Sequence, residues 1–149
     1  MQKRSQRRST VVAVAAVAAV AGCSSTPPTS HQPPGSLPPT TAQVTVNGQS
    51  AGTTHHVACT QDGWMHTIKT GDDKSGVTVV VSTGNAVRAE SVVITNVGDF
   101  TGSVYGSRIG KAEATIIGTT FRVNGTAEGA TNAEPNRSTT ANFDIKANC

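Results

Sequence analysis

The chain has 149 residues and a formal net charge of +3, with 36% hydrophobic residues and three cysteines. Four of the twelve basic residues precede Cys23 and all nine acidic residues follow it, so the remainder of the chain carries a net charge of −1. This remainder has no Lys/Arg cluster, which excludes nucleic acid as an expected partner because such binding needs a basic surface.

Residues 1–22 have the composition of a signal peptide. An apolar run at residues 11–21 follows a segment with four basic residues, Lys3, Arg4, Arg7 and Arg8. A run of about 11 residues is too short to span a membrane, which requires about 20 helical residues, but it matches the core of an export signal. The Arg7-Arg8 pair also fits twin-arginine export, although its flanking residues match that signal poorly and favour ordinary export.

The signal segment ends in Val20-Ala21-Gly22-Cys23, which has the pattern of a lipobox. Small side chains before the cysteine allow the extended chain to fit into the cleft of a signal peptidase. The Cys23 thiol takes up a diacylglycerol. Cleavage before Cys23 then frees an amine for N-palmitoylation. Ordinary secretory cleavage beside an incidental cysteine is the alternative. The sequence therefore predicts a membrane anchor through lipid on Cys23, at the extracytoplasmic face of the cell membrane.

Residues 23–42 form a predicted linker. This segment holds six of the seven prolines in three pairs, and Ser, Thr and Gln fill most of the remainder. Such a composition cannot bury a core, so we expect a flexible chain that is partly extended as polyproline II. Its Ser and Thr residues could accept O-linked sugars, or the linker could be an unmodified spacer.

From residue 43 to residue 149 the pattern is that of one all-β domain. Runs of β-branched residues are separated by Gly, Asn and Asp, which is typical of short strands and turns. The predicted strands are 43–46, 56–60, 64–69, 77–82, 89–96, 111–117, 120–126 and 141–147. We expect a monomeric domain with a single antiparallel β-sandwich or a strongly curled sheet. A hairpin at Gly118-Thr119 would place Ile116 and Phe121 on the core side.

Cys59 and Cys149 remain once Cys23 carries lipid. Both would lie in an exported compartment, where disulfides persist. The domain has only five aromatic residues. A small domain with so few large core side chains has limited stability, to which a disulfide would add. A bridge would require the last strand to run beside the strand that holds Cys59. A catalytic thiol and a metal ligand are the alternatives.

His55, His56 and His66 are candidate metal ligands together with Cys59. A turn at Asp62-Gly63 would place Cys59 opposite His66, and a zinc site would need such convergence. No acidic residue is placed to complete the site, and a disulfide would consume the thiol. We therefore expect a half-buried His66, solvated His55 and His56, and neither metal nor cofactor.

Gly98, Gly102, Gly106 and Gly110 recur every four residues. The polar residues between them exclude a membrane helix, and segment 106–112 lacks the spacing and the hydroxyl group of a phosphate loop. We interpret these glycines as bends or close strand contacts, with a ligand cleft as the alternative. No Ser-His-Asp order or paired-carboxylate signature is present, so no catalytic residue is predicted.

Several short segments occur in an order typical of one known family. They are the lipobox at Cys23, VTVNG at 44–48, VACT at 57–60, NVG at 96–98, FRVNGTAEG at 121–129, Pro135, FDI at 143–145 and Cys149. On these segments the chain resembles the mycobacterial 19 kDa lipoprotein antigen family. The resemblance implies a surface-exposed, immunogenic envelope lipoprotein without catalytic residues. It also implies that innate lipopeptide receptors of the host sense the acylated N-terminus, and that the protein takes part in host-cell adhesion.

Three function classes follow from these patterns. The leading hypothesis is a non-enzymatic, lipid-anchored envelope antigen. The second is a lipid- or glycan-binding carrier module of the envelope, and the third is an enzyme. A cavity of about 300 Å³ or more with an apolar lining would favour the carrier, whereas a filled core would favour the antigen.

Overall fold

The computed structural model describes residues 32–149, which fold into ten antiparallel β-strands. They are β1 (Thr41–Val46), β2 (Gln49–Thr54), β3 (Val57–Asp62), β4 (Met65–Gly71), β5 (Gly76–Ser82), β6 (Arg88–Val97), β7 (Phe100–Tyr105), β8 (Lys111–Ile117), β9 (Thr120–Thr131) and β10 (Thr139–Asn148). Within this described part, no helix is long and apolar enough to cross a membrane.

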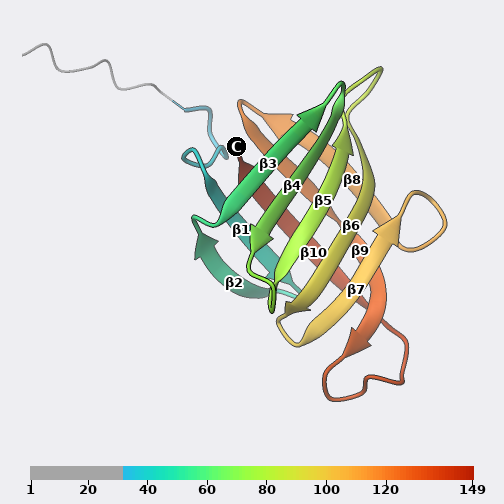
Figure 1. The fold of residues 1–149 in the computed structure, drawn as a ribbon. Coiled ribbons are helices and arrows are strands. Elements are labelled where there is room, and N and C mark those ends of the chain that lie inside the picture. The colour runs from blue at the N-terminus through green and yellow to red at the C-terminus, as the bar shows by residue number, and fades with distance from the viewer. Residues whose placement is uncertain (1–31) are drawn as a thin grey trace, which may run out of the picture. The chain divides into compact units, whose positions relative to one another are not determined.

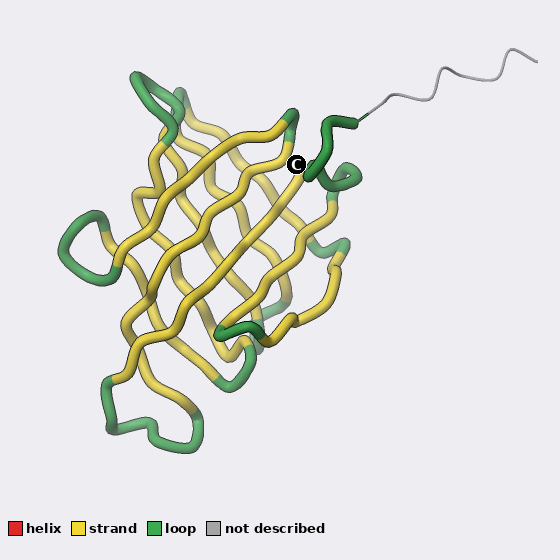
Figure 2. Tube along the Cα trace, turned by 180° about the vertical axis from the view of Figure 1, so that it is seen from behind, coloured by secondary structure: helices red, strands yellow, loops and turns green. Residues whose placement is uncertain are grey.

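All ten strands belong to one sheet that folds over on itself. The strand order is β2-β1-β10-β9-β7-β6-β5-β4-β3, and β8 pairs with β9 beside this path. Strands β3 to β6 form one layer, and β1, β10, β9 and β8 lie behind them (Figure 1). Figure 2 shows the same arrangement from the opposite side. The prediction of a strongly curled, antiparallel all-β sheet is confirmed.

The long strand β9 is shared between two neighbours on the same side. Its first half pairs with β8 and its second half with β7, while β10 pairs along its other side. Two glycines permit this close approach. A Cβ on Gly125 would lie 2.0 Å from the carbonyl oxygen of Lys111, and one on Gly129 would lie 2.0 Å from that of Thr101. These glycines therefore mark positions where only backbone fits between the strands.

The glycine series from Gly98 to Gly110 marks bends and close contacts, as predicted. Gly98, Gly106 and Gly110 have positive φ angles of 57°, 54° and 65°. A Cβ on Gly102 would lie 2.5 Å from the ring of Phe100.

The core is built mainly from aliphatic side chains that alternate along the strands. Phe100, Phe121 and Phe143 are its aromatic members, whereas Trp64 and Tyr105 are 65% and 48% exposed. Apolar residues of β1, β9 and β10 in one layer face those of β4, β5 and β6 in the other. They include Val44, Val46, Ile68, Val77, Val79, Val81, Val92, Ile94, Val123 and Ile145. The core is thus even poorer in aromatic rings than the composition indicates.

Two strands lie outside the predicted set. β2 is an edge strand with the polar, mostly exposed sequence QSAGTT, so it has no apolar alternation to detect. β7 does alternate toward the core, but Gly102 interrupts its apolar pattern between Phe100 and Val104.

Two hairpins were predicted with different accuracy. The Gly118-Thr119 hairpin is confirmed, since Ile116 pairs with Phe121 and Phe121 is buried. The expectation for Ile116 is wrong: it is 39% exposed, because β8 pairs with β9 alone among the described strands. The other turn lies at Gly63-Trp64, where Gly63 takes a φ of 57°, so Gln61 rather than Cys59 lies opposite His66.

Replacing Gly125 by alanine should destabilise the sheet, because the new Cβ would overlap the backbone of β8. We expect the free energy of unfolding to fall by about 1–3 kcal/mol, as for other overpacked sites. Urea denaturation measures this change. Gly84→Ala is the matched control, since a Cβ there would meet its nearest atoms at 3.5 Å and no positive φ opposes it. Equal stability of both variants would contradict the close approach.

Candidate functional site

The linker joins the domain at a buried contact. Leu37 is 7% exposed, its backbone N–H donates to Thr120 Oγ1 at 2.8 Å, and its carbonyl accepts from Asn148 Nδ2. Ordered packing therefore starts within the segment assigned to the linker, and β1 begins at Thr41 rather than at the expected residue 43. Sequence reasoning missed this contact, although Leu37 is the one large aliphatic residue between residues 24 and 41.

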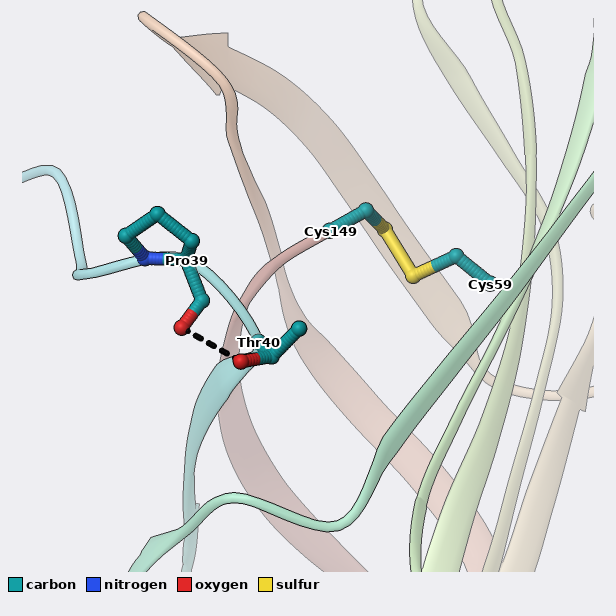
Figure 3. Close-up of a disulfide and its surroundings, with 4 residues drawn as sticks. All are labelled: Pro39, Thr40, Cys59 and Cys149. Carbon is teal, nitrogen blue, oxygen red and sulfur yellow. Dashed lines mark hydrogen bonds between the residues drawn. A yellow bond between two sulfur atoms is a disulfide. The ribbon is translucent and has the colours of Figure 1, made fainter.

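Cys59 and Cys149 form the predicted disulfide, with Cα atoms 5.9 Å apart. Figure 3 shows the bridge between β3 and the last residue of the chain, near Pro39 and Thr40 of the segment that leads into β1. The expectation that the last strand runs beside β3 is wrong, because β10 pairs with β1 and β9 whereas β3 pairs with β4. The bridge instead links the end of one layer to the edge strand of the other.

The bridge and the linker contact lie at the same end of the domain. Asn148, which holds the carbonyl of Leu37, is the residue before Cys149. We call the region formed by Leu37, Thr120, Asn148 and the Cys59–Cys149 bridge the tether end. A shallow depression of about 430 Å³ lies there, lined by the bridge, His66, Ile116 and Phe121 among others. The rings of His66 and Phe121 have centroids 5.1 Å apart.

His66 lies on β4, whereas His55 and His56 lie between β2 and β3, and the rings of His66 and His55 have different partners. His66 Nε2 lies 3.2 Å from Thr83 Oγ1, and His55 Nδ1 lies 3.4 Å from Thr41 Oγ1. His66 is half-buried and His55 and His56 are exposed, as predicted. Among residues 32–149, no cluster of three or more His, Cys, Asp and Glu side chains is arranged to hold a metal ion. Cys59 is consumed by the bridge.

Two charged groups have shifted pKa values, and neither lies at the tether end. The backbone N–H groups of Ser75 and Lys74 donate to the Asp72 carboxylate and lower its pKa. Hydrogen bonding to Asp144 raises the pKa of Arg122, on the solvent-facing side of β9 and β10. Both shifts follow from ordinary surface contacts rather than from a reactive arrangement.

The loops at the other end of β10 are tied to one another. We call segments 47–48, 72–75, 98–99 and 132–138 the distal loops. Asn132 Nδ2 donates to Asn96 Oδ1, and its backbone N–H donates to the carbonyl of Asp99. Ser75 Oγ donates to the carbonyl of Asn96, and the backbone N–H of Asn142 donates to Asn47 Oδ1. These bonds connect turns that are far apart in the sequence.

Removing the disulfide by Cys149→Ser should lower the free energy of unfolding by about 2–5 kcal/mol, because the bridge closes a long loop in the unfolded chain. Chemical denaturation of the oxidised protein and its variants measures the loss. Cys59→Ser should have a similar effect, and the double variant should add little to either. A Cys149→Ser protein as stable as the parent would contradict a structural role for the bridge.

Thr120→Val should loosen the linker contact, because the buried N–H of Leu37 loses its acceptor. Leaving such a group unpaired costs about 1–3 kcal/mol. We expect faster hydrogen exchange at the Leu37 amide. Thr119→Val, at the exposed neighbouring position, is the control and should leave that exchange rate unchanged. Unchanged exchange in Thr120→Val would show that this bond does not hold the linker.

Comparison with known proteins agrees with the resemblance seen in the sequence. Residues 35–149 match the family described as Mycobacterium 19 kDa lipoprotein antigen. A putative lipoprotein of Mycobacterium avium subsp. hominissuis is 37% identical over 145 residues, covering 96% of this chain and 95% of the relative. Lipoprotein LpqH of Mycobacterium tuberculosis is 31% identical, covering 72% of this chain and 68% of the relative.

A third relative is the probable lipoprotein LppE of Mycobacterium tuberculosis, which is 33% identical and covers 76% of this chain and 81% of its own length. The family match spans both bridged cysteines and the whole sheet. The chain therefore belongs to the mycobacterial 19 kDa lipoprotein antigen family.

Proposed function

We propose that this protein is a non-enzymatic lipoprotein, anchored by S-diacylglycerol and N-palmitoyl groups on Cys23 at the extracytoplasmic face of the cell membrane. Cys23 and the signal segment lie outside the described residues. The lipobox supports the anchor, and so do the relatives named as lipoproteins. Two or more acyl chains hold a protein stably on a bilayer, whereas one gives marginal binding.

The observation that carries the proposal furthest is the fixed position at which the tether meets the domain. Leu37 is held by Thr120 and Asn148, so the chain enters the described domain at the tether end. The 14 residue steps from Cys23 to Leu37 can extend over at most about 50 Å. We propose that the tether end faces the membrane and that the distal loops face outward.

Two of the distal loops are hydrogen-bonded to neighbouring strands on this surface. Asn132 Nδ2 donates to Asn96 Oδ1 of β6, and the backbone N–H of Asn142 on β10 donates to Asn47 Oδ1. We propose that this surface is presented to partners outside the cell, including host cells. Innate lipopeptide receptors would instead engage the acylated N-terminus, so the two interactions would use opposite ends of the protein.

Two observations support an antigen rather than a carrier or an enzyme. The interior of the sheet is filled by aliphatic side chains from both layers, which favours the antigen over a carrier with an internal cavity. The titratable groups with shifted pKa values lie on exposed surfaces and have structural partners.

Cys23→Ala tests the anchor directly. Without the thiol no diacylglycerol can be attached, so the variant should lose the acyl mass and leave the detergent phase in a Triton X-114 partition. Ser25→Ala, just outside the lipobox, is the control and should partition like the parent. A Cys23→Ala protein that still enters the detergent phase would contradict anchoring through Cys23.

A further inference from the structure

The single tryptophan of the chain stands exposed at the turn between β3 and β4. Trp64 is 65% exposed, the most exposed of the large hydrophobic residues described. Its backbone is nevertheless fixed, because its carbonyl accepts from both the N–H and the Oγ1 of Thr83, at 2.8 and 3.1 Å. An indole on a fixed stretch of backbone, with much of its surface open to solvent, is an aromatic platform available to a ligand.

The residue beneath the ring leaves that platform accessible. A Cβ on Gly84 would lie 3.5 Å from the indole atoms Cδ1 and Cγ, which is ordinary contact, and Gly84 does not have a positive φ. Neither backbone geometry nor a clash therefore requires glycine here. Because Gly84 has no side chain, a depression of about 320 Å³ stays open beside Trp64.

Polar groups line this depression around the ring. Asn85, Arg88 and Glu90 lie along it, and all three are exposed. Among the described residues, the salt bridges join Arg122 to Asp144 and Arg137 to Glu134, so neither Arg88 nor Glu90 is held in an ion pair. Together they offer guanidinium and amide donors beside carboxylate and amide acceptors, with opposite charges that balance.

The depression continues beyond Arg88 and Glu90. These two residues also line a second depression of about 530 Å³, which reaches the Gly106-Ser107 turn and the small side chains of Ala112 and Ala114 on β8. The two depressions therefore adjoin at Arg88 and Glu90, and we call them together the trough, with Trp64 at one end. A trough of this kind suits an elongated ligand rather than a compact one.

We propose that this trough binds a neutral saccharide chain. A pyranose ring has a face of C–H groups that packs on an aromatic ring and a rim of hydroxyls that bond to Asn, Arg and Glu side chains. Sites that combine an aromatic surface with a few placed polar groups are typical of small-ligand recognition. Glu113 lines the second depression together with Arg88 and Glu90, and this excess of negative charge disfavours a strongly anionic ligand. A shallow site predicts weak affinity. The proposal does not depend on the lipid anchor.

Because Trp64 is the only tryptophan, its fluorescence reports on the trough alone. The mature lipoprotein in a zwitterionic detergent without sugar headgroups is titrated with manno-, galacto- and malto-oligosaccharides. We expect a saturable change in emission with at least one series and a dissociation constant that falls as the oligosaccharide lengthens. No saturable change with any of them overturns the proposal.

Variants measured by titration calorimetry locate the site. Trp64→Ala should weaken binding about tenfold or more, Trp64→Phe should retain part of it, and Gly84→Leu should block it by filling the depression. Arg88→Ala should weaken binding, whereas Arg137→Ala and Ile116→Ala, which lie elsewhere, should not.

Equal binding by parent and Trp64→Ala would overturn the proposal, as would an emission change produced by phosphatidylglycerol vesicles but by no oligosaccharide. Circular dichroism checks that each variant is folded.

Discussion

The bridge between Cys59 and Cys149 is the constraint on which the tether end depends. It joins the edge strand β3 to the residue after β10, across a separation of 90 residues. β3 pairs on one side only, with β4, and it covers a core whose aromatic members are three phenylalanines, so the bridge ties down an edge strand. Asn148 is held by the pairing of β10 with β1 and β9, and the bridge adds a covalent link at the next residue. Asn148 in turn holds Leu37.

This chain of contacts connects the fold to the proposed anchor. A tether attached through a loose segment would let the domain take any orientation on a membrane. The contact at Leu37 instead brings the tether to one defined end, while β10 carries the distal loops at the other. The proposed saccharide trough lies between the β3–β4 turn, the β5–β6 loop and β8. The Trp64 carbonyl bonds to Thr83, whose hydroxyl also lies 3.2 Å from His66 of the tether-end depression, so the trough adjoins the tether end rather than the distal loops.

Much of the fold could be predicted from the sequence because its strands carry clear period-two patterns. Phe121 and Val123 on β9 and Phe143 and Ile145 on β10 face the core as their alternation indicates. The period-two pattern failed to predict burial where burial depends on which strands lie next to a given strand. Ile116 has the right period but lies on a strand with one partner, and β2 is polar because it forms an edge. Only the three-dimensional arrangement decides which periodic residues are covered.

Among the candidate sites, the disulfide could be predicted from the sequence, whereas the positions of Leu37 and Trp64 could not. The pairing of Cys59 with Cys149 follows from compartment and number, because once Cys23 carries lipid two cysteines remain. The docking of Leu37 and the exposure of Trp64 could not be deduced, since both depend on segments that are distant in the sequence: Thr120 and Asn148 for Leu37, and Thr83 and Gly84 for Trp64. Composition also counts Trp64 as a candidate core residue, whereas the short turn places it in solvent.

We expect the bridge to hold the tether end together as one unit. Hydrogen exchange on the full chain, compared before and after reduction, measures this. β3, the end of β10 and the Leu37 amide should lose protection together, while the distal loops keep theirs. Uniform loss of protection across the sheet would show that the bridge does not act locally, and an unchanged Leu37 amide after complete reduction would show that it does not hold the linker contact.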